Sequence, residues 1–352
     1  MMYKNRKVIV DLAALQSNIA LIKNTLAPGR KILAYVKAQA YGHGMSEAFI
    51  SAMHQVDGYA VACLEEAKQL RLVTDQKIVL NGAHLCQKTF DQARDLKVDV
   101  IVHQAQFESS QIASWSSLWL KVNTGMNRMG LTSAQARQIL SEYPEKPTVL
   151  MTHLADSLPY SAGNEKQIDQ LKQLKHDFPH VELSFANSSR LLSGQDVGDW
   201  VRPGLLLYGI SAFSEKVPLA ELMQPISRFC ARVIAHQHLN EGDTVGYDRT
   251  YVALKAERIA IVAAGYADGY PRISKAALFV ADHARFYSVV GKVSMDTLSI
   301  CESEGHLPEI GSWVTLWGDH VRLEAVANAC ERSPYELLVH VSDRVNREYI
   351  GG

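Results

Sequence analysis

Short apolar runs of strand length recur along the first two-thirds of the chain. They are rich in valine, isoleucine, leucine and aromatic residues, as expected for buried strands. Eight such runs occur, at residues 31–36, 58–62, 77–82, 98–103, 118–123, 148–153, 181–187 and 202–209. Between them lie segments with apolar residues at helical spacing, at residues 45–55, 63–73, 89–97, 133–143 and 165–178. This alternation of strand and helix predicts a parallel sheet.

The number of strands indicates how this sheet is arranged. Eight strands within residues 31–209 fit a (β/α)8 TIM-like barrel better than an open, doubly wound sheet. The open sheet would usually have fewer strands and a glycine-rich phosphate turn after the first of them, and the sequence has no such turn.

The pattern changes near residues 223–225. Strand-like runs then follow one another directly, separated by turn-forming pairs such as Gly-Asp and Asp-Gly. We therefore predict two domains, a (β/α)8 barrel over residues 1–225 and a mostly β C-terminal domain over residues 226–352. The length of 352 residues agrees with this division, because one core rarely serves so long a chain.

Composition and charge narrow the class of protein. The chain is 47% hydrophobic and 21% charged, with a net charge of −1, so nothing in it attracts nucleic acid or a membrane surface. Asp11 interrupts the apolar run near the start, which argues against a signal peptide. The five cysteines are scattered and form no Cys-x-x-Cys pair, so we expect reduced thiols in a cytoplasmic protein, without disulfides or a metal site.

The segment AYVKAQAYGHG, residues 34–44, holds the most informative lysine. Lys37 comes directly after a predicted buried strand, where its ammonium would be poorly solvated. Desolvation lowers the pKa of an amine, and a neutral amine can form a Schiff base with an aldehyde. The alternative is a strand whose lysine simply extends to the surface, as most lysines do.

Other polar residues also follow the predicted strands. In a barrel of this kind the chemistry takes place at the carboxyl ends of the strands. Taken singly, each polar residue has a structural explanation, such as a core histidine, a solvated charge or a helix cap. Together they predict a site for an anionic carbonyl cofactor at this end of the barrel. The residues are Lys37, Tyr41, Lys121, Arg128, His153, Ser188, Arg202 and Gly204.

Eight motifs, taken in order, resemble those of the alanine racemases. Members of this family are pyridoxal-phosphate enzymes with a barrel and a β domain. The resemblance extends over nearly the whole chain. The motifs lie at residues 34–44, 120–130, 151–155, 185–189, 199–210, 242–251, 265–272 and 290–296.

The resemblance implies a function and two catalytic residues. The function is interconversion of L-alanine and D-alanine, either for cell-wall peptidoglycan or in alanine catabolism. Lys37 matches the lysine that holds pyridoxal 5'-phosphate and acts as one base. Tyr247 matches the second base, which serves the opposite face from the neighbouring subunit of a homodimer. Arg128 matches an arginine near the substrate carboxylate, and Met295 a residue whose backbone meets the substrate.

The resemblance also implies a set of cofactor-binding and supporting residues. Arg202 matches the arginine that faces the pyridine nitrogen, and His153 a histidine beside the ring. Lys121 matches a lysine that is often carbamylated in the family. The positions that match phosphate-binding residues are Tyr41, Ser188, Gly204 and Leu205. Three more supporting positions are Asp296, next to Met295, and Tyr266 and Tyr270, which match residues that line the path of the substrate into the site.

Two other functions remain as alternatives. A related barrel-plus-β enzyme, such as an amino-acid decarboxylase, would typically supply a cysteine from the partner subunit, whereas this chain has Tyr247 at the reacting position. A non-catalytic pyridoxal-phosphate carrier would resemble the barrel alone, so the additional β domain argues against it.

Overall fold

The computed structural model forms two compact units. It describes residues 5–82, 84, 86–105, 115, 117–158, 161–211, 217–272, 278–283 and 285–352. One unit, called here the barrel unit, consists of residues 16–40 and 45–223. The other, the β unit, consists of residues 1–15, 41–44 and 224–352.

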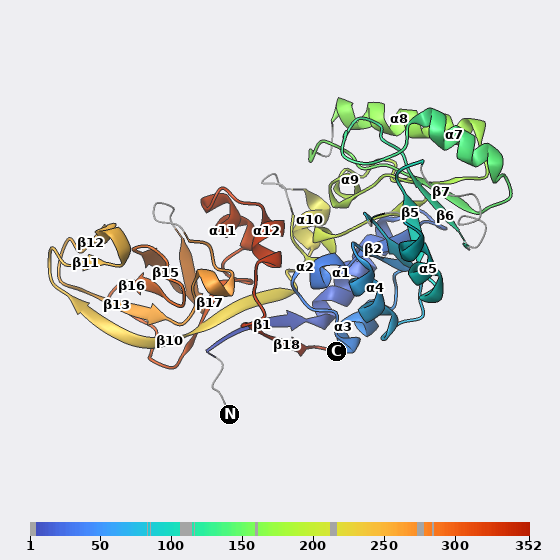
Figure 1. The fold of residues 1–352 in the computed structure, drawn as a ribbon. Coiled ribbons are helices and arrows are strands. Elements are labelled where there is room, and N and C mark those ends of the chain that lie inside the picture. The colour runs from blue at the N-terminus through green and yellow to red at the C-terminus, as the bar shows by residue number, and fades with distance from the viewer. Residues whose placement is uncertain are drawn as a thin grey trace. The chain divides into compact units, whose positions relative to one another are not determined.

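Eight parallel strands make up the sheet of the barrel unit (Figure 1). Between the two ends of this sheet, Asp199 N donates to Leu183 O at 2.8 Å, and Ser184 Oγ donates to Trp200 O at 3.0 Å. The sheet is therefore nearly closed, which confirms the predicted barrel. In spatial order the strands are β8 (Glu182–Ser184), β7 (Thr148–Met151), β6 (Leu118–Lys121), β5 (Asp99–Val102), β4 (Ile78–Leu80), β3 (Gly58–Val61), β2 (Lys31–Tyr35) and β9 (Trp200–Val201).

Helices occupy the five segments for which the sequence predicts them. Thr132 and Gln135 form a capping box at the start of α7 (Ser133–Glu142), and Ser161 caps α8 (Ala162–Asp177), so local side chains define where these helices begin. A further helix, α1 (Leu12–Thr25), precedes the first barrel strand. The five helices are α3 (Glu47–Ala52), α4 (Leu64–Arg71), α5 (Gln87–Asp95), α7 (Ser133–Glu142) and α8 (Ala162–Asp177).

The predicted eighth strand, at residues 202–209, is wrong in its position. The strand found there is β9, which ends at Val201, and the apolar run Leu205–Tyr208 forms a 3-10 helix, η1. Pro203 has no N–H group for a sheet ladder. All four residues of η1 are buried, and a short run that is apolar on every side gives no period by which to tell strand from helix.

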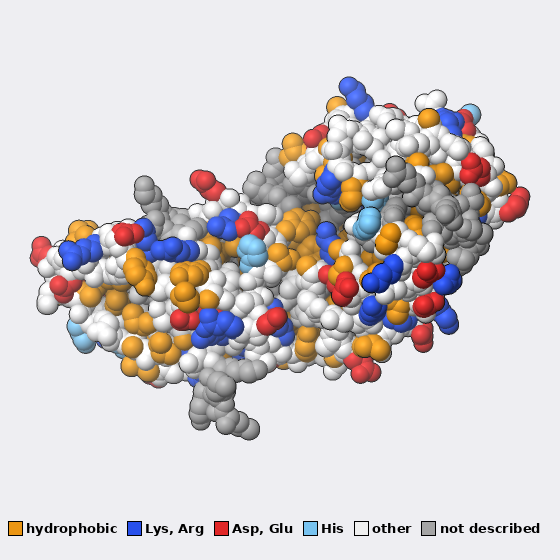
Figure 2. All heavy atoms as spheres, viewed as in Figure 1, with side chains coloured by type: hydrophobic (Ala, Val, Ile, Leu, Met, Phe, Trp, Pro, Cys, Tyr) orange, Lys and Arg blue, Asp and Glu red, His pale blue; other side chains and the backbone are white. Residues whose placement is uncertain are grey.

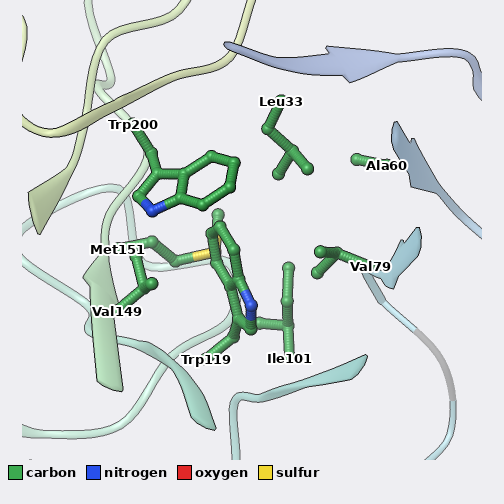
Figure 3. Packing of buried hydrophobic residues seen from close by; sticks show 8 residues of the cluster. All are labelled: Leu33, Ala60, Val79, Ile101, Trp119, Val149, Met151 and Trp200. Carbon is green, nitrogen blue, oxygen red and sulfur yellow. The ribbon is translucent and has the colours of Figure 1, made fainter. Parts of the chain in front are cut away.

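Two indole rings fill the middle of the barrel (Figure 3). Trp119 and Trp200 pack edge to face with their ring centroids 5.3 Å apart. Around them lie side chains from the surrounding strands, including Leu33, Val79 and Met151, and all are buried. The barrel is thus a packed core, and chemistry is left to the ends of its strands.

The β unit contains a closed ring of six antiparallel strands. The ring is possible because β10 (Ser227–Leu239) is 13 residues long, so one half pairs with β17 (Trp313–Trp317) and the other with β13 (Glu257–Val262). The strands of the ring, in order from β10, are β13 (Glu257–Val262), β16 (Leu298–Cys301), β15 (Arg285–Val290), β14 (Phe279–Asp282) and β17 (Trp313–Trp317).

Strand β1 (Arg6–Asp11) belongs to this second sheet, although its residues fall within the predicted barrel domain. It pairs antiparallel with β10 and parallel with β18 (Asn346–Ile350). The domain boundary at residue 225 stays a prediction. Shorter elements complete the unit: the hairpin of β11 (Thr244–Val245) and β12 (Tyr251–Val252), the 3-10 helices η2 (Tyr247–Arg249) and η3 (Tyr266–Asp268), and the helices α11 (Leu323–Ala329) and α12 (Pro334–Val339).

The surface charge is mixed. Figure 2 shows acidic and basic side chains interspersed over the described part of the visible face, without a large area of one sign. This distribution agrees with the net charge of −1. Within the described ranges, no helix combines the length and apolar character that a bilayer span requires.

Candidate active site

The backbone directly after Lys37 forms a left-handed turn. Lys37–Tyr41 is the short element α2, and residues 38–41 all have φ between 51° and 55°. Left-handed helical backbone costs residues other than glycine roughly 1–2 kcal/mol each, so the surroundings must hold the turn in place. One hydrogen bond, from Ala40 N to Val36 O at 2.8 Å, ties the turn to the residue directly before it.

Lys37 stands at the carboxyl end of β2, as predicted, and its amine is electrostatically perturbed. The side chain reaches solvent, yet partial burial lowers the pKa of Lys37, and the positive charge of Arg128 lowers it further. The Glu66 carboxylate acts in the opposite direction. The net lowering has the direction that the sequence predicts, and it enlarges the fraction of neutral amine at a given pH.

Positive charges gather beside Lys37. Lys121, the last residue of β6, is only 3% exposed, and burial followed by the charges of Arg128, Arg202 and Lys37 lowers its pKa to about 8. Burial, Arg202, Arg128 and the two lysines also lower the pKa of His153 to about 3, so its imidazole is neutral at physiological pH. Lys121, Arg128 and His153 line one small pocket.

Arg202, directly after β9, is buried and held by oxygen acceptors. Its Nη1 donates to Ser184 Oγ at 2.8 Å and its Nη2 to Thr152 O at 2.6 Å. Burial lowers the pKa of Arg202, and the nearby phenol of Tyr35 opposes this. Tyr35 in turn accepts a hydrogen bond from Asn81 Nδ2 at 2.8 Å. The guanidinium is therefore fixed in direction within the barrel unit.

A hydroxyl and backbone N–H groups meet near the ends of β8 and β9. Ser188 begins the short helix α9 (Ser188–Leu192), and its Oγ accepts from Gly204 N at 3.1 Å and Leu206 N at 3.3 Å. Leu205 lies between these two donors and is fully buried. Hydroxyl and backbone N–H groups of this kind are suitable donors for a phosphate.

The groups in the barrel unit fit pyridoxal phosphate. Lys37 provides an amine of lowered pKa for a carbonyl carbon. Arg202 provides a fixed cation, and the hydroxyl of Ser188, which accepts from Gly204 N, can donate its own proton to a phosphate. The donor set thus contains a partner for each polar end of this cofactor.

Tyr247 lies on the surface of the β unit. It is the first residue of η2, in the loop between β11 and β12, and 61% of it is exposed. The loop is shaped by Gly246, whose φ is +73°, and by an ion pair between Asp248 and Lys292. An exposed tyrosine on an ordered loop is well placed to contact another molecule.

Three other predicted residues, Tyr266, Met295 and Asp296, lie in two segments that are hydrogen-bonded to each other. Tyr266 N donates to Ser294 O at 3.1 Å, and Ala267 N donates to Met295 O at 3.0 Å. Met295 is 53% exposed. Asp296 accepts from Arg344 Nη2 at 2.5 Å, and this hydrogen bond also holds the loop that carries Met295.

Tyr270 and Tyr41 lie in the core of the β unit. Tyr270 is 1% exposed and stacks on Trp317 with ring centroids 6.0 Å apart, and burial raises the pKa of its phenol. It also lines a cavity of about 410 Å³ together with Tyr266. Tyr41 is buried, with its ring 5.8 Å from that of Tyr335. The role of Tyr270 on the substrate path stays a prediction.

The predicted residues are thus divided between the two units. Those in the barrel unit are Lys37, Lys121, Arg128, His153, Ser188, Arg202, Gly204 and Leu205. Those in the β unit are Tyr41, Tyr247, Tyr266, Tyr270, Met295 and Asp296.

Several supporting residues are absent from the sequence-based prediction. Thr152 Oγ1 donates to Val122 O at 2.9 Å, and Gln167 Nε2 donates to His153 O at 3.1 Å, so both hold the loops that carry Arg128 and His153. Gln167 gives a weak signal, because it is a polar residue on the buried face of a predicted helix. Glu66 and Tyr35 give no such signal. In the sequence, Glu66 looks like any exposed charge on a helix, and Tyr35 looks like any aromatic residue in a strand.

Comparison with known proteins gives one consistent result. The family described as "Alanine racemase, N-terminal domain" matches residues 10–212, and "Alanine racemase, C-terminal domain" matches residues 226–349. The chain is 36% identical over 355 residues to a protein of Pseudomonas aeruginosa named "Alanine racemase, biosynthetic", a match covering 97% of this chain and 98% of that one.

Solved structures agree with the sequence comparison. Alanine racemase from Acinetobacter baumannii has a TM-score of 0.92 and 32% identity, with 99% of this chain and 100% of that chain covered. Alanine racemase from Bartonella henselae, with covalently bound pyridoxal phosphate, has a TM-score of 0.84 and 26% identity, with 98% and 99% covered.

Proposed function

The chain belongs to the alanine racemase family, and on this premise we propose that Lys37 and Tyr247 are the two bases of the reaction. The protein is an isomerase that interconverts L-alanine and D-alanine with pyridoxal phosphate as its cofactor. This activity supplies D-alanine for peptidoglycan or serves alanine catabolism. The observation that carries the assignment of Lys37 is its amine of lowered pKa at the carboxyl end of β2.

Racemisation requires a base on each face of the substrate. One base removes the proton from Cα and the other returns a proton to the opposite face, so the substrate need not turn over. When bound, pyridoxal phosphate supplies the electron-withdrawing ring that makes this proton acidic. The lowered pKa of Lys37 leaves more of its amine neutral and able to accept the proton. Tyr247 is proposed for the other face.

Arg202 favours racemisation over other reactions of the same cofactor. An arginine keeps its protons, so it cannot give one to the pyridine nitrogen that we propose it faces. With Arg202 as partner in place of a carboxylic acid, the bound ring would take up less negative charge, which would favour return of the proton to Cα over transamination. The neutral imidazole of His153 adds no further charge beside the ring.

We propose that the remaining polar groups bind the ends of the substrate and cofactor. Ser188, Gly204, Leu205 and Tyr41 are proposed to hold the phosphate. Arg128 is proposed to hold the substrate carboxylate, and the backbone of Met295 to meet the substrate. Lys121, Asp296, Tyr266 and Tyr270 are proposed as supporting residues.

We further propose a cytoplasmic homodimer with shared active sites. Exposure of Tyr247 and Met295 supports this, because both side chains are available to a second copy of the chain. All five cysteines are unpaired, which favours a reducing compartment.

Two experiments test the proposed function. Purified protein is assayed for racemisation across a panel of L-amino acids, and release of carbon dioxide and an amine instead would indicate a decarboxylase. The protein is also reduced with borohydride and digested, and the phosphopyridoxyl group is located by mass spectrometry. A label on any residue other than Lys37 would overturn the assignment of that lysine.

The shared site is tested by mixing two inactive variants. Lys37→Ala lacks one base and Tyr247→Phe lacks the other, and a mixed dimer contains one intact site if each site takes one base from each subunit. Activity should then return on mixing. No recovery after verified subunit exchange would contradict the shared site.

A further inference from the structure

One carboxylate connects the backbone directly after Lys37 with the neighbouring strand. Glu66 Oε1 accepts from Ala38 N at 2.6 Å, and Glu66 Oε2 accepts from Ala62 N at 2.7 Å. Ala38 begins the left-handed turn, and Ala62 directly follows β3. Glu66 itself lies in the first turn of α4.

This connection begins where the sheet ladder ends. Strands β2 and β3 are parallel neighbours, and Val36 N still donates to Ala60 O at 3.0 Å. One residue past Lys37 the backbone has turned left-handed, and the Glu66 carboxylate accepts the Ala38 N–H there. A second contact supports the same turn, since Gln39 Nε2 donates to Gln69 Oε1 on α4 at 2.7 Å. Helix α4 therefore holds the turn through two side chains.

The charge of Glu66 also reaches the Lys37 amine. Arg128 disfavours the ammonium form of Lys37, and Glu66 favours it. Glu66 is thus linked to Lys37 both through the backbone at Ala38 and through space.

We propose that Glu66 is a positioning residue for Lys37. By holding the Ala38 N–H, its carboxylate fixes the left-handed turn and with it the direction in which the Lys37 side chain leaves the backbone. The inference rests on the proposed role of Lys37 as the reacting lysine, and it adds a residue outside the set of proposed cofactor and substrate contacts.

Two variants separate position from charge. Glu66→Gln keeps the length of the side chain but loses the charge, and its amide turns a donor toward one of the two N–H groups. Glu66→Asp keeps the charge but is one methylene too short to span Ala38 and Ala62. Glu65→Gln is the matched control, because Glu65 is the exposed neighbour in the same helical turn and makes the same change in charge.

Two readouts are taken on the full-length protein. The first is kcat and KM for alanine racemisation. The second is the apparent pKa of Lys37 in protein stripped of pyridoxal phosphate, obtained from the pH dependence of trace acetylation of Lys37 read by peptide mass spectrometry. Thermal unfolding confirms that each variant is folded.

We expect both Glu66 variants to lower kcat by about 10- to 100-fold, because displacement of a reacting group by about 1 Å costs this much. KM for alanine should change far less, and Glu65→Gln should match the unmodified protein in both readouts. The pKa of Lys37 should fall in Glu66→Gln, where a favourable negative charge is lost, and should fall less in Glu66→Asp.

The inference is overturned if Glu66→Asp folds and keeps kcat within about twofold of the unmodified protein, since charge alone would then suffice. It is also overturned if Glu66→Gln changes neither kcat nor the acetylation of Lys37. Failure of the proposed function gives a different result: borohydride then places the cofactor on another residue, while acetylation of Lys37 still reports on its contact with Glu66.

Discussion

Replacement of Lys121 by methionine should stabilise the protein at neutral pH. Lys121 is almost fully buried, and the charges that act on its amine, those of Arg128, Arg202 and Lys37, are all positive. Methionine keeps a flexible apolar chain of similar length in β6 and removes the buried cation. The variant thus deletes a charge that the folded protein accommodates at a cost.

The size of this cost follows from the pKa of Lys121. Its ordinary value is 10.5, and in the folded protein it is about 8. The difference of about 2.5, at about 1.4 kcal/mol for each pH unit, corresponds to roughly 3 kcal/mol. This is an upper value for the gain, because methionine must also repack against the side chains around it.

The two pKa values of Lys121, in the unfolded chain and in the folded protein, also determine how the stability of the protein changes with pH. Below about pH 8 the lysine is charged in both the folded and the unfolded state, so the full cost is present. Between about pH 8 and 10.5 the folded protein has lost the proton and the unfolded chain still holds it, so the stability of the unmodified protein rises with pH. The advantage of Lys121→Met should therefore shrink across this window.

Urea unfolding at pH 7, 8.5 and about 10 measures the effect. Buffers free of carbon dioxide are needed, because a neutral lysine amine can add CO2 and become a negatively charged carbamate. Tryptophan fluorescence follows both units, through Trp119 and Trp200 in the barrel unit and Trp313 and Trp317 in the β unit. Lys166→Met is the matched control, because Lys166 is exposed on α8.

Two outcomes would refute this reasoning. One is a Lys121→Met protein no more stable than Lys166→Met at pH 7. The other is a difference between the two that stays constant up to about pH 10. We also expect lower racemase activity in Lys121→Met, since polar groups at active sites are commonly kept at the expense of stability.

Three further changes have defined outcomes. Tyr247→Phe should keep the cofactor bound and keep the exchange of the D-alanine Cα proton with solvent deuterium, whereas the same exchange for L-alanine should slow by about 10²–10⁴-fold. Equal loss of exchange for both enantiomers would contradict two separate bases. Gly265→Ala should lower kcat/KM for alanine with cofactor absorbance unchanged, because a Cβ there would lie 2.2 Å from Ser294 O and 2.4 Å from Met295 O; normal kinetics would show that this loop is not needed. Thr152→Val should lower the free energy of unfolding, measured in urea, by about 1–3 kcal/mol, because it removes the hydrogen bonds to Val122 O and Thr124 Oγ1. A change near zero would mean that these two hydrogen bonds make no net contribution to stability.

The barrel could be predicted from the sequence because its strands are buried on both sides. Runs such as residues 98–103 and 118–123 each contain a continuous apolar stretch, at residues 100–102 and 118–120, and the helices between the runs keep a clear period. The same property explains the error at residues 202–209. The run Leu205–Tyr208 is also continuously apolar, but it follows Pro203 and a bend at Gly204 and forms a 3-10 helix.

The site could be predicted only where residue type and strand ends coincide. Lys37, Lys121 and His153 lie at or just after the ends of strands, and their chemistry is unusual enough to stand out. The left-handed turn at residues 38–41 contains no glycine, so the local sequence does not predict it. Glu66 has the same sequence context as its exposed neighbour Glu65, and only the tertiary contact with Ala38 distinguishes the two.

The place of β1 in the second sheet has a consequence for synthesis of the protein on the ribosome. Both partners of this strand lie far along the chain, since β10 begins at residue 227 and β18 at residue 346. At about 5–20 residues per second, roughly 10–40 s pass between the synthesis of β1 and that of its first partner. All eight barrel strands are translated during this interval, while β1 has unpaired hydrogen-bonding groups on both edges. A nascent chain of this protein therefore carries an open strand until β10 has been synthesised, and chaperones that bind extended apolar segments have that long to reach it.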